Sequence, residues 1–449
     1  MNNGKNRSNA FDVIIIGGGT AGVVAAIQAG RAGASTLLVE KSGVLGGTLV
    51  LNAVNFPGLF HAWGQQVIAG IGWDLVADAV AETGGVLPDF SKWRGRPHYR
   101  LQVRVNRAAF AALADERVVK AGVTLSLHTM LAGVAWRGDR WVVTLCEKEG
   151  LREVRCRVLV DCTGDANVVA QAGLPLAKNP HLQPGTLTVR TAGYDLSTLD
   201  LDVLERAFKK AVAAGRLQRS DLSAETRPVE YFLRVHGENS VHVSGIDGGT
   251  SRGRTEAELA ARRLILRVQR FLREQPGLDH FHYDYFATEC GLRETATIVG
   301  EVCVSGDDYK SGRVWEDAVC YSFYPIDIHH ICGPGVDTRP LREGVLPTIP
   351  YRALLPRDSR NLIVAGRNVS GDQEAHSAFR IQASVMAMGQ SAGAAAALAA
   401  QKGCELREVP LAEIHAVLRE HGAIVPCREF SEELATVARQ DAASRVASS

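Results

Sequence analysis

The sequence is poor in the features that mark several common classes of protein. Its 449 residues carry a formal net charge of only +1, which gives no sign of a basic surface for nucleic acid or for an anionic membrane. The longest run of small apolar residues, 391–400, is too short and too rich in alanine to span a bilayer. The polar N-terminus has no apolar segment of the kind that a secretory signal needs. We therefore expect a cytoplasmic protein with no membrane partner.

Cysteine and histidine patterns exclude further classes. None of the nine cysteines falls in a C-x-x-C pair or at zinc or iron–sulfur spacing, so we expect free thiols. Residues 49–72 also lack the C-x-x-x-x-C pair that disulfide reductases use, which argues against thiol–disulfide exchange. The pairs His280/His282 and His329/His330 have no carboxylate or cysteine cluster beside them, so no metal site is predicted.

The most informative stretch that is present is residues 12–48. A β-branched apolar run, 12–16, predicts a buried parallel strand, and glycines then follow in G-x-G-x-x-G register before a helix over 21–31. A second apolar run, 35–39, ends in an acid that can accept hydrogen bonds from a ribose diol. This context favours a dinucleotide-binding unit over a glycine turn of an unrelated α/β protein. The continuation E-K-x-x-x-x-G-G resembles FAD enzymes more than NAD dehydrogenases, so FAD is the expected dinucleotide. The expected cofactor contacts here are Gly17, Gly19, Thr20, Ala21, Gly22, Glu40, Lys41, Gly46, Gly47 and Thr48.

Two later segments have the same character. The buried strand 155–160 runs into DCTGDA, and the strand 362–365 ends in a glycine and an arginine. After a polar loop, 370–376, we expect one long small-residue helix, AFRIQASVMAMGQSAGAAAALAA, whose N-terminus would face the flavin. The alternative is a packing helix with no flavin contact. Further cofactor contacts are therefore predicted at Thr163, Gly164, Asp165, Gly366, Arg367, Gln390 and Gly393.

The rest of the chain divides by composition. A helix is expected over 106–121, followed by strands 123–127, 130–137 and 141–147 in a small antiparallel sheet. In the middle region we expect a helix over 201–214 and strands at 231–234 and 241–243. A capping box at 255–258 should start a long arginine-rich helix that ends near residue 273. We interpret its arginines as a solvated face opposite Leu259, Leu266 and Phe271, and not as a basic patch.

These elements predict an α/β fold with a discontinuous cofactor domain. A Rossmann-like FAD-binding domain is expected from 11–180 and 341–405, with a smaller α+β substrate or cap domain at 181–340. Residues 1–10 are expected to form a disordered leader, and 406–449 a short surface helix and a frayed tail.

Taken together, the motifs resemble the FAD-dependent oxidoreductase family that is distantly similar to the succinate dehydrogenase and fumarate reductase flavoproteins. The resemblance covers residues 12–402 and rests on GGGTAG with E-K-x-x-x-x-G-G, DCTGDA, GLRETATIVGE with DAVCYSFYPIDIH, and AGRNVSGDQEAHSAFRIQ. It implies FAD as the cofactor. It also implies that His376 and Arg380, in an H-x-x-x-R pair, lie over the flavin, with the arginine holding a substrate carboxylate and the histidine moving a proton. Arg293 and His329 are further catalytic candidates from the cap.

The departures from that family narrow the expectation. There is no F-H-P-T stretch, so dicarboxylate reduction is in doubt, and no histidine at 46–48 for covalent attachment, so FAD should be noncovalent. The predicted activity is hydride transfer between flavin N5 and a small organic substrate. Because Arg380 can hold an anion, this substrate can be anionic. A flavin monooxygenase and an FAD-binding electron-transfer subunit of a larger complex stay open as alternatives. The electron acceptor and any homo-oligomer are not specified by the sequence.

Overall fold

The glycine-rich stretch folds as a strand, a turn and a helix, as its residues predict. The computed structural model describes residues 8–331, 333–434 and 436, so most of the predicted leader and the tail beyond residue 439 lie outside it. β1 (Ala10–Ile16) and β2 (Thr36–Val39) are buried, because their β-branched and leucine side chains have helices on their faces. Gly17 has a φ of +104°, and a Cβ there would lie 2.4 Å from the Cys162 carbonyl oxygen. Only glycine fits this turn before α1 (Thr20–Arg31).

The main sheet joins parallel and antiparallel strands. The parallel part includes β18 (Leu362–Val364), which pairs with the last residues of β8 (Gly150–Asp161). The strand predicted at 123–127 belongs to this parallel part, because it pairs with β2 and not with the antiparallel strands. The helix before it makes a crossover connection, which places the next strand parallel. The strand order is β5 (Thr124–Ser126), β2, β1, β8 (Gly150–Asp161), β7 (Arg140–Glu147) and β6 (Met130–Arg137).

The late small-residue segment forms two helices, where the sequence predicted one. α9 (Gln373–Phe379) begins inside the expected polar loop, because the Asp372 carboxylate accepts a hydrogen bond from the Ala375 N–H and caps the helix. The backbone is extended at Ile381, and α10 (Gln382–Lys402) then starts afresh. The break therefore falls directly after Arg380.

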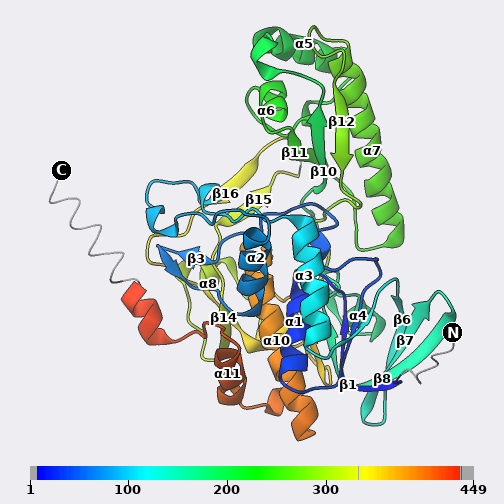
Figure 1. Cartoon of the computed structure of the whole chain (residues 1–449), viewed down its shortest axis with the longest axis vertical. Coiled ribbons are helices and arrows are strands. Elements are labelled where there is room, and N and C mark those ends of the chain that lie inside the picture. Colours follow the sequence, from blue (N-terminus) through cyan, green and yellow to red (C-terminus); the bar gives the residue numbers. More distant parts are fainter. Residues whose placement is uncertain (1–7, 332, 435, 437–449) are drawn as a thin grey trace.

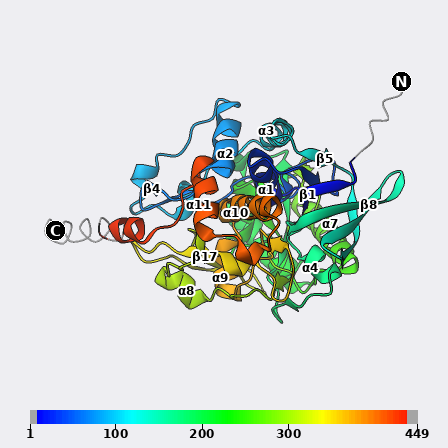
Figure 2. The same cartoon turned by 90° about the horizontal axis from the view of Figure 1, so that it is seen from below.

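Helix α10 packs at close range on α1. A Cβ at Gly389 or Gly393 would lie 2.3 Å from the carbonyl oxygen of Ala21 or Ala25 respectively. By length and composition α10 could cross a membrane, but 89% of its most apolar window is buried inside the protein. Seen from below, it lies beside α1 within the molecule (Figure 2). Its apolar character is thus accounted for by packing against the cofactor fold.

A second hydrophobic core lies at one end of the molecule (Figure 1). Apart from Ala53, it gathers apolar side chains between Leu187 and Cys290, whereas Ile298 and Ile326 pack in the hydrophobic core around the main sheet, which we call the first core. The domain boundaries at 181 and 340 stay a prediction. What we call the second core consists of β10 (Gly185–Ala192), β11 (Gly237–Val243), β12 (His282–Phe286), α5 (Leu201–Ala213), α6 (Pro228–Arg234) and α7 (Ser251–Arg273).

Two predictions for this region are wrong in detail. Residues 231–234 lie in helix α6 and not in a strand, because Pro228 occupies the first helical turn and the helix buries Phe232 and Leu233. Helix α7 begins one turn before the expected capping box, where the Thr250 hydroxyl accepts a hydrogen bond from the Gly253 N–H.

The faces of α7 also differ from the prediction. Leu259 and Leu266 are 44% and 46% exposed, and of the three expected core residues only Phe271 is buried. The buried face consists of Gly253, Ala257, Ala261, Leu264, Val268, Phe271 and Leu272. Arg262 forms an ion pair with Glu258, and Arg267 with Asp221, so acids offset much of this helix's charge as expected.

The remaining elements cover the sheet or link the two cores. The helices are α2 (Ile71–Ala81), α3 (Arg107–Lys120), α4 (Asn167–Gln171), α8 (Gly306–Ser311) and α11 (Leu411–Glu420). The short two-stranded pairs are β3 (His61–Ala62) with β4 (Gln65–Gln66), β9 (Leu176–Ala177) with β13 (Thr297–Ile298), β14 (Ala318–Tyr321) with β17 (Thr348–Pro350), and β15 (Ile326–His329) with β16 (Val336–Arg339).

Candidate active site

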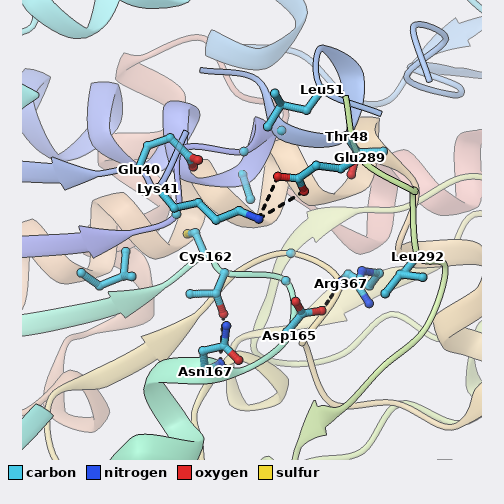
Figure 3. Close-up of a pocket in the computed structure, with 18 of the residues that line it drawn as sticks. Glu40, Lys41, Thr48, Leu51, Cys162, Asp165, Asn167, Glu289, Leu292 and Arg367 are labelled. Atoms are coloured by element: carbon cyan, nitrogen blue, oxygen red, sulfur yellow. Dashed lines mark hydrogen bonds and ion pairs between the residues drawn. The ribbon is translucent and has the colours of Figure 1, made fainter. Parts of the chain in front are cut away.

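A cavity of about 530 Å³ opens where β1, β2, β8 and β18 end. Ligands of open α/β sheets bind at this edge. Figure 3 shows Lys41 and Glu289 at one side of the cavity and Asp165 and Arg367 at another. Most of the predicted cofactor residues line this cavity. They are Gly17, Gly19, Thr20, Ala21, Glu40, Lys41, Gly47, Thr48, Thr163, Gly164, Asp165, Gly366 and Arg367.

Four predicted cofactor residues lie outside the cavity lining. A Cβ at Gly22 would lie 1.8 Å from the Gly17 carbonyl oxygen, so this glycine lets α1 approach β1, and Gly46 takes a φ of +106° in the turn before Gly47. The Gln390 side chain donates a hydrogen bond to Gln28 Oε1 at 3.1 Å and accepts one from the Ile71 N–H. Gln390 and Gly393 make packing contacts between helices, and the cofactor contacts predicted for them stay a prediction.

Glu40 stands at the end of β2, where the dinucleotide fold places an acid. One carboxylate oxygen accepts from the Gly18 N–H at 2.7 Å, and the other accepts from the Ser42 N–H at 2.7 Å. These bonds fix the carboxylate at the cavity wall and leave it further lone pairs for a ligand hydroxyl. Lys41 forms an ion pair with Glu289 at 3.0 Å, which joins the loop after β2 to the far wall of the cavity.

Arg380 is the one predicted catalytic residue that lines the cavity. Its side chain is only 10% exposed, and one of its terminal nitrogens lies 3.6 Å from an Asp327 carboxylate oxygen. Its Nε is buried and has no hydrogen-bond partner within the described part of the chain. Burial lowers the pKa of Arg380, and the nearby Asp327 carboxylate opposes that change. A guanidinium in this state can still bind an anion from the cavity side.

His376 lies next to the cavity wall without lining it. Its Nε2 donates a hydrogen bond to the Arg367 carbonyl oxygen at 2.7 Å, so Nε2 carries the proton, and the buried Nδ1 has no partner within the described residues. Burial, followed by the charge of Arg380, lowers the pKa of His376 to about 4. The side chain is therefore neutral at pH 7.

Arg293 and His329 lie near enough to Arg380 for its charge to act on both. Arg293 donates to the Pro184 carbonyl oxygen at 2.7 Å and to the Thr186 hydroxyl at 2.6 Å, and burial together with Arg380 lowers its pKa to about 9. His329 Nε2 lies 3.7 Å from an Asp327 carboxylate oxygen. Burial and then Arg293 lower the pKa of His329 well below its usual value, which keeps it neutral. The two residues share the neighbourhood of Arg380 but not the cavity wall.

Three residues of this region were not predicted from the sequence. Asp327 sits in a run of prolines and aromatics that has no motif, and His242, whose ring centre lies 5.2 Å from that of His329, comes from a strand far away in the sequence. Arg254 lines the cavity from helix α7, where it looked like one of many surface arginines. Across the described ranges, no group of three or more His, Cys, Asp and Glu residues is placed to hold a metal ion.

A family model described as FAD dependent oxidoreductase matches residues 12–418. The chain belongs to this family. This FAD-dependent oxidoreductase has the groups that the cofactor needs at the cavity, namely a glycine turn that a Cβ would fill at Gly17 and a fixed acid at Glu40. The match is to the family as a whole, so the narrower likeness to succinate dehydrogenase and fumarate reductase stays a prediction.

Similar proteins include two curated enzymes. Dihydrolipoyl dehydrogenase of Trypanosoma brucei brucei is 47% identical over 55 residues, 12% of either chain. Digeranylgeranylglycerophospholipid reductase of Methanocaldococcus jannaschii is 26% identical over 220 residues, 47% of this chain. The chain covers 12% and 52% of the lengths of these two relatives. Among solved structures, a geranylgeranyl bacteriochlorophyll reductase-like protein of Thermoplasma acidophilum aligns over 96% of this chain and 88% of its own, with 12% identity and a TM-score of 0.42.

Proposed function

We propose that this FAD-dependent oxidoreductase transfers a hydride to or from a small organic anion that is bound by Arg380. The observation that carries the proposal is the position of this arginine in the cavity, with a buried Nε that lacks a partner in the described part of the protein. A guanidinium binds a carboxylate through two parallel hydrogen bonds, which fixes both the position and the orientation of a substrate.

The charges around Arg380 support an anionic substrate. Asp327 is the carboxylate nearest to Arg380, whereas the hydrogen-bond partners of Arg293 in the described chain are a carbonyl, a hydroxyl and an amide oxygen. His329 is neutral, so it offsets neither charge. Asp327 acts on both guanidinium groups, and a second buried carboxylate, Glu294, acts on Arg380 while neutral amide side chains hold it. A substrate carboxylate would give the unpartnered Nε of Arg380 a charged acceptor inside the cavity, where an unpaired polar group is costly to bury.

The neutral histidines favour substrate oxidation. FAD, when bound, supplies a two-electron acceptor for a hydride. The proton released by the substrate then needs an acceptor, and a neutral imidazole is one. We assign this role to Nδ1 of His376, because Nε2 carries the proton that is donated to the Arg367 carbonyl oxygen and Nδ1 is the unprotonated nitrogen, with no partner among the described residues. We also propose that FAD is held noncovalently in a cytoplasmic enzyme.

An anaerobic titration of the visible spectrum tests the proposal. Small hydroxy and amino acids are added to the holoprotein, alongside their amides, alcohols and sugars of similar size. We expect one or more carboxylates to bleach the long-wavelength flavin band, and the matched neutral compounds to leave it unchanged. Bleaching by neutral compounds alone would contradict an anionic substrate.

The same titration separates the other candidate activities. Because one relative is named a digeranylgeranylglycerophospholipid reductase, the dithionite-reduced protein is also given a prenylated phospholipid. Reoxidation by that lipid would replace the small substrate with a lipid one. Oxygen uptake with a hydroxylated product would indicate a monooxygenase. A yellow protein that no compound bleaches would favour the electron-transfer subunit.

A further inference from the structure

Helix α7 brings an arginine from the second core into the cavity. Arg254 donates a hydrogen bond to one Asp165 carboxylate oxygen at 2.6 Å, and Arg367 pairs with the other oxygen. Thr295 completes this group, since its hydroxyl donates to Asp165 at 2.8 Å and accepts from Arg367 at 2.8 Å. Three parts of the chain therefore meet at the cavity wall: the turn after β8, the turn after β18 and the start of α7.

The cluster of Arg254, Asp165 and Arg367 has one positive charge too many. The side chains are 30%, 12% and 17% exposed respectively, so water screens them incompletely. Burial alone would raise the pKa of Asp165, but Arg367 and Arg254 lower it to about 2, so the carboxylate is ionised at neutral pH. One carboxylate faces two guanidinium groups.

Other acids near the cavity are already engaged. Glu289 pairs with Lys41, and backbone N–H groups bind both oxygens of Glu40. Asp247, close to the start of α7, pairs with Lys178. These acids are therefore not free to neutralise the extra positive charge of the cluster, and an anionic ligand in the cavity can do so. In FAD the anionic group is the diphosphate.

We propose that Arg254 is an FAD-binding residue, and that the diphosphate of FAD supplies the negative charge that the Arg254–Asp165–Arg367 cluster lacks. The second core then belongs to the cofactor site. Binding of FAD stabilises the arrangement in which α7 is docked on the cavity, by linkage. The inference concerns cofactor binding and does not depend on the proposed substrate.

The test compares two arginines of one helix. Arg252 lies two residues before Arg254, is 90% exposed and pairs with Glu256 at 3.0 Å, so Arg252→Gln is the matched control. Apoprotein of each variant is titrated with FAD, and binding is followed by quenching of flavin fluorescence. We expect Arg254→Gln to raise the Kd of FAD about tenfold or more, and Arg252→Gln to change it less than twofold. Added salt should weaken binding to the wild type more than to Arg254→Gln.

A purely structural role for Arg254 predicts a different result. In that case Arg254→Gln lowers the melting temperatures of apoprotein and holoprotein equally and leaves the Kd unchanged, which would overturn the proposal. Arg254→Lys keeps the charge and should bind FAD within about fivefold of the wild type. If Arg254→Gln does not fold, the salt dependence of FAD binding is compared in the wild type and Arg254→Lys instead. An FAD affinity that salt does not alter in either protein contradicts the proposal.

Discussion

Arg380 and Arg293 show how far a single side chain can be assigned from sequence. Both come from predicted catalytic segments and have little exposure, but only Arg380 lines the cavity. The H-x-x-x-R pair placed Arg380 just before a helix, and the structure has it at the break between α9 and α10, in the cavity lining. Arg293 donates to neutral oxygen atoms and does not line the cavity. It can therefore act on the site only through the electrostatic effect of its positive charge.

The buried, neutral state of His376 predicts a pH dependence of stability. Its pKa is about 4 in the folded protein against 6.5 when exposed, so acid protonates the unfolded chain first. The contribution of neutral His376 to the free energy of unfolding is fully present above pH 6.5. It falls between pH 6.5 and 4 and is lost below pH 4. A difference of this size corresponds to about 3 kcal/mol. We expect His376→Gln to flatten the dependence of the unfolding free energy on pH in this window.

Urea unfolding of the apoprotein at several pH values measures this effect. His181→Gln is the control, because His181 is exposed and its side chain should leave the curve unchanged. If His376→Gln and the wild type lose stability in parallel from pH 6.5 to 4, His376 is not the neutral buried group described above.

At the scale of elements, the packing of α10 on α1 explains Gly393, which the sequence assigned to the cofactor site. A Cβ at Gly393 would meet the Ala25 carbonyl oxygen at 2.3 Å, so Gly393→Ala must push the helices apart. We expect a loss of about 1–3 kcal/mol in the unfolding free energy of the apoprotein. At Gly133, in β6, no atom lies closer than 3.8 Å to the added Cβ, so Gly133→Ala should be neutral. A Gly393→Ala protein of normal stability that binds FAD weakly would instead restore the predicted cofactor role.

Helices and strands could be predicted from the sequence where neighbouring residues alone determine them. The strand, glycine turn and helix of residues 10–31 follow from hydrophobic pattern and turn geometry, and the structure has them. Residues 231–234 have strand-like composition, but Pro228 and a shared core commit them to a helix. The extra helix α9 depends on a single cap at Asp372, in a segment too polar to show an apolar period.

At the scale of the whole molecule, the candidate site is assembled from segments that are far apart in the sequence. The glycine fingerprint predicted its cofactor half, because those residues form one continuous unit. Asp327 and Arg254 reach the same region from β15 and α7, and no local pattern marks either of them. Their roles follow from which side chains the two cores bring together, which spacing along the chain does not encode.

The most direct test of the account is a difference spectrum of the oxidised holoprotein with short carboxylates that do not react. If an anion binds at Arg380 beside the flavin, acetate and its longer homologues should perturb the flavin band in a saturable way, whereas their amides should not. Arg380→Gln should abolish the response, and Arg360→Gln, at an exposed arginine, should retain it. An Arg380→Gln protein that responds to carboxylates as the wild type does would contradict the account.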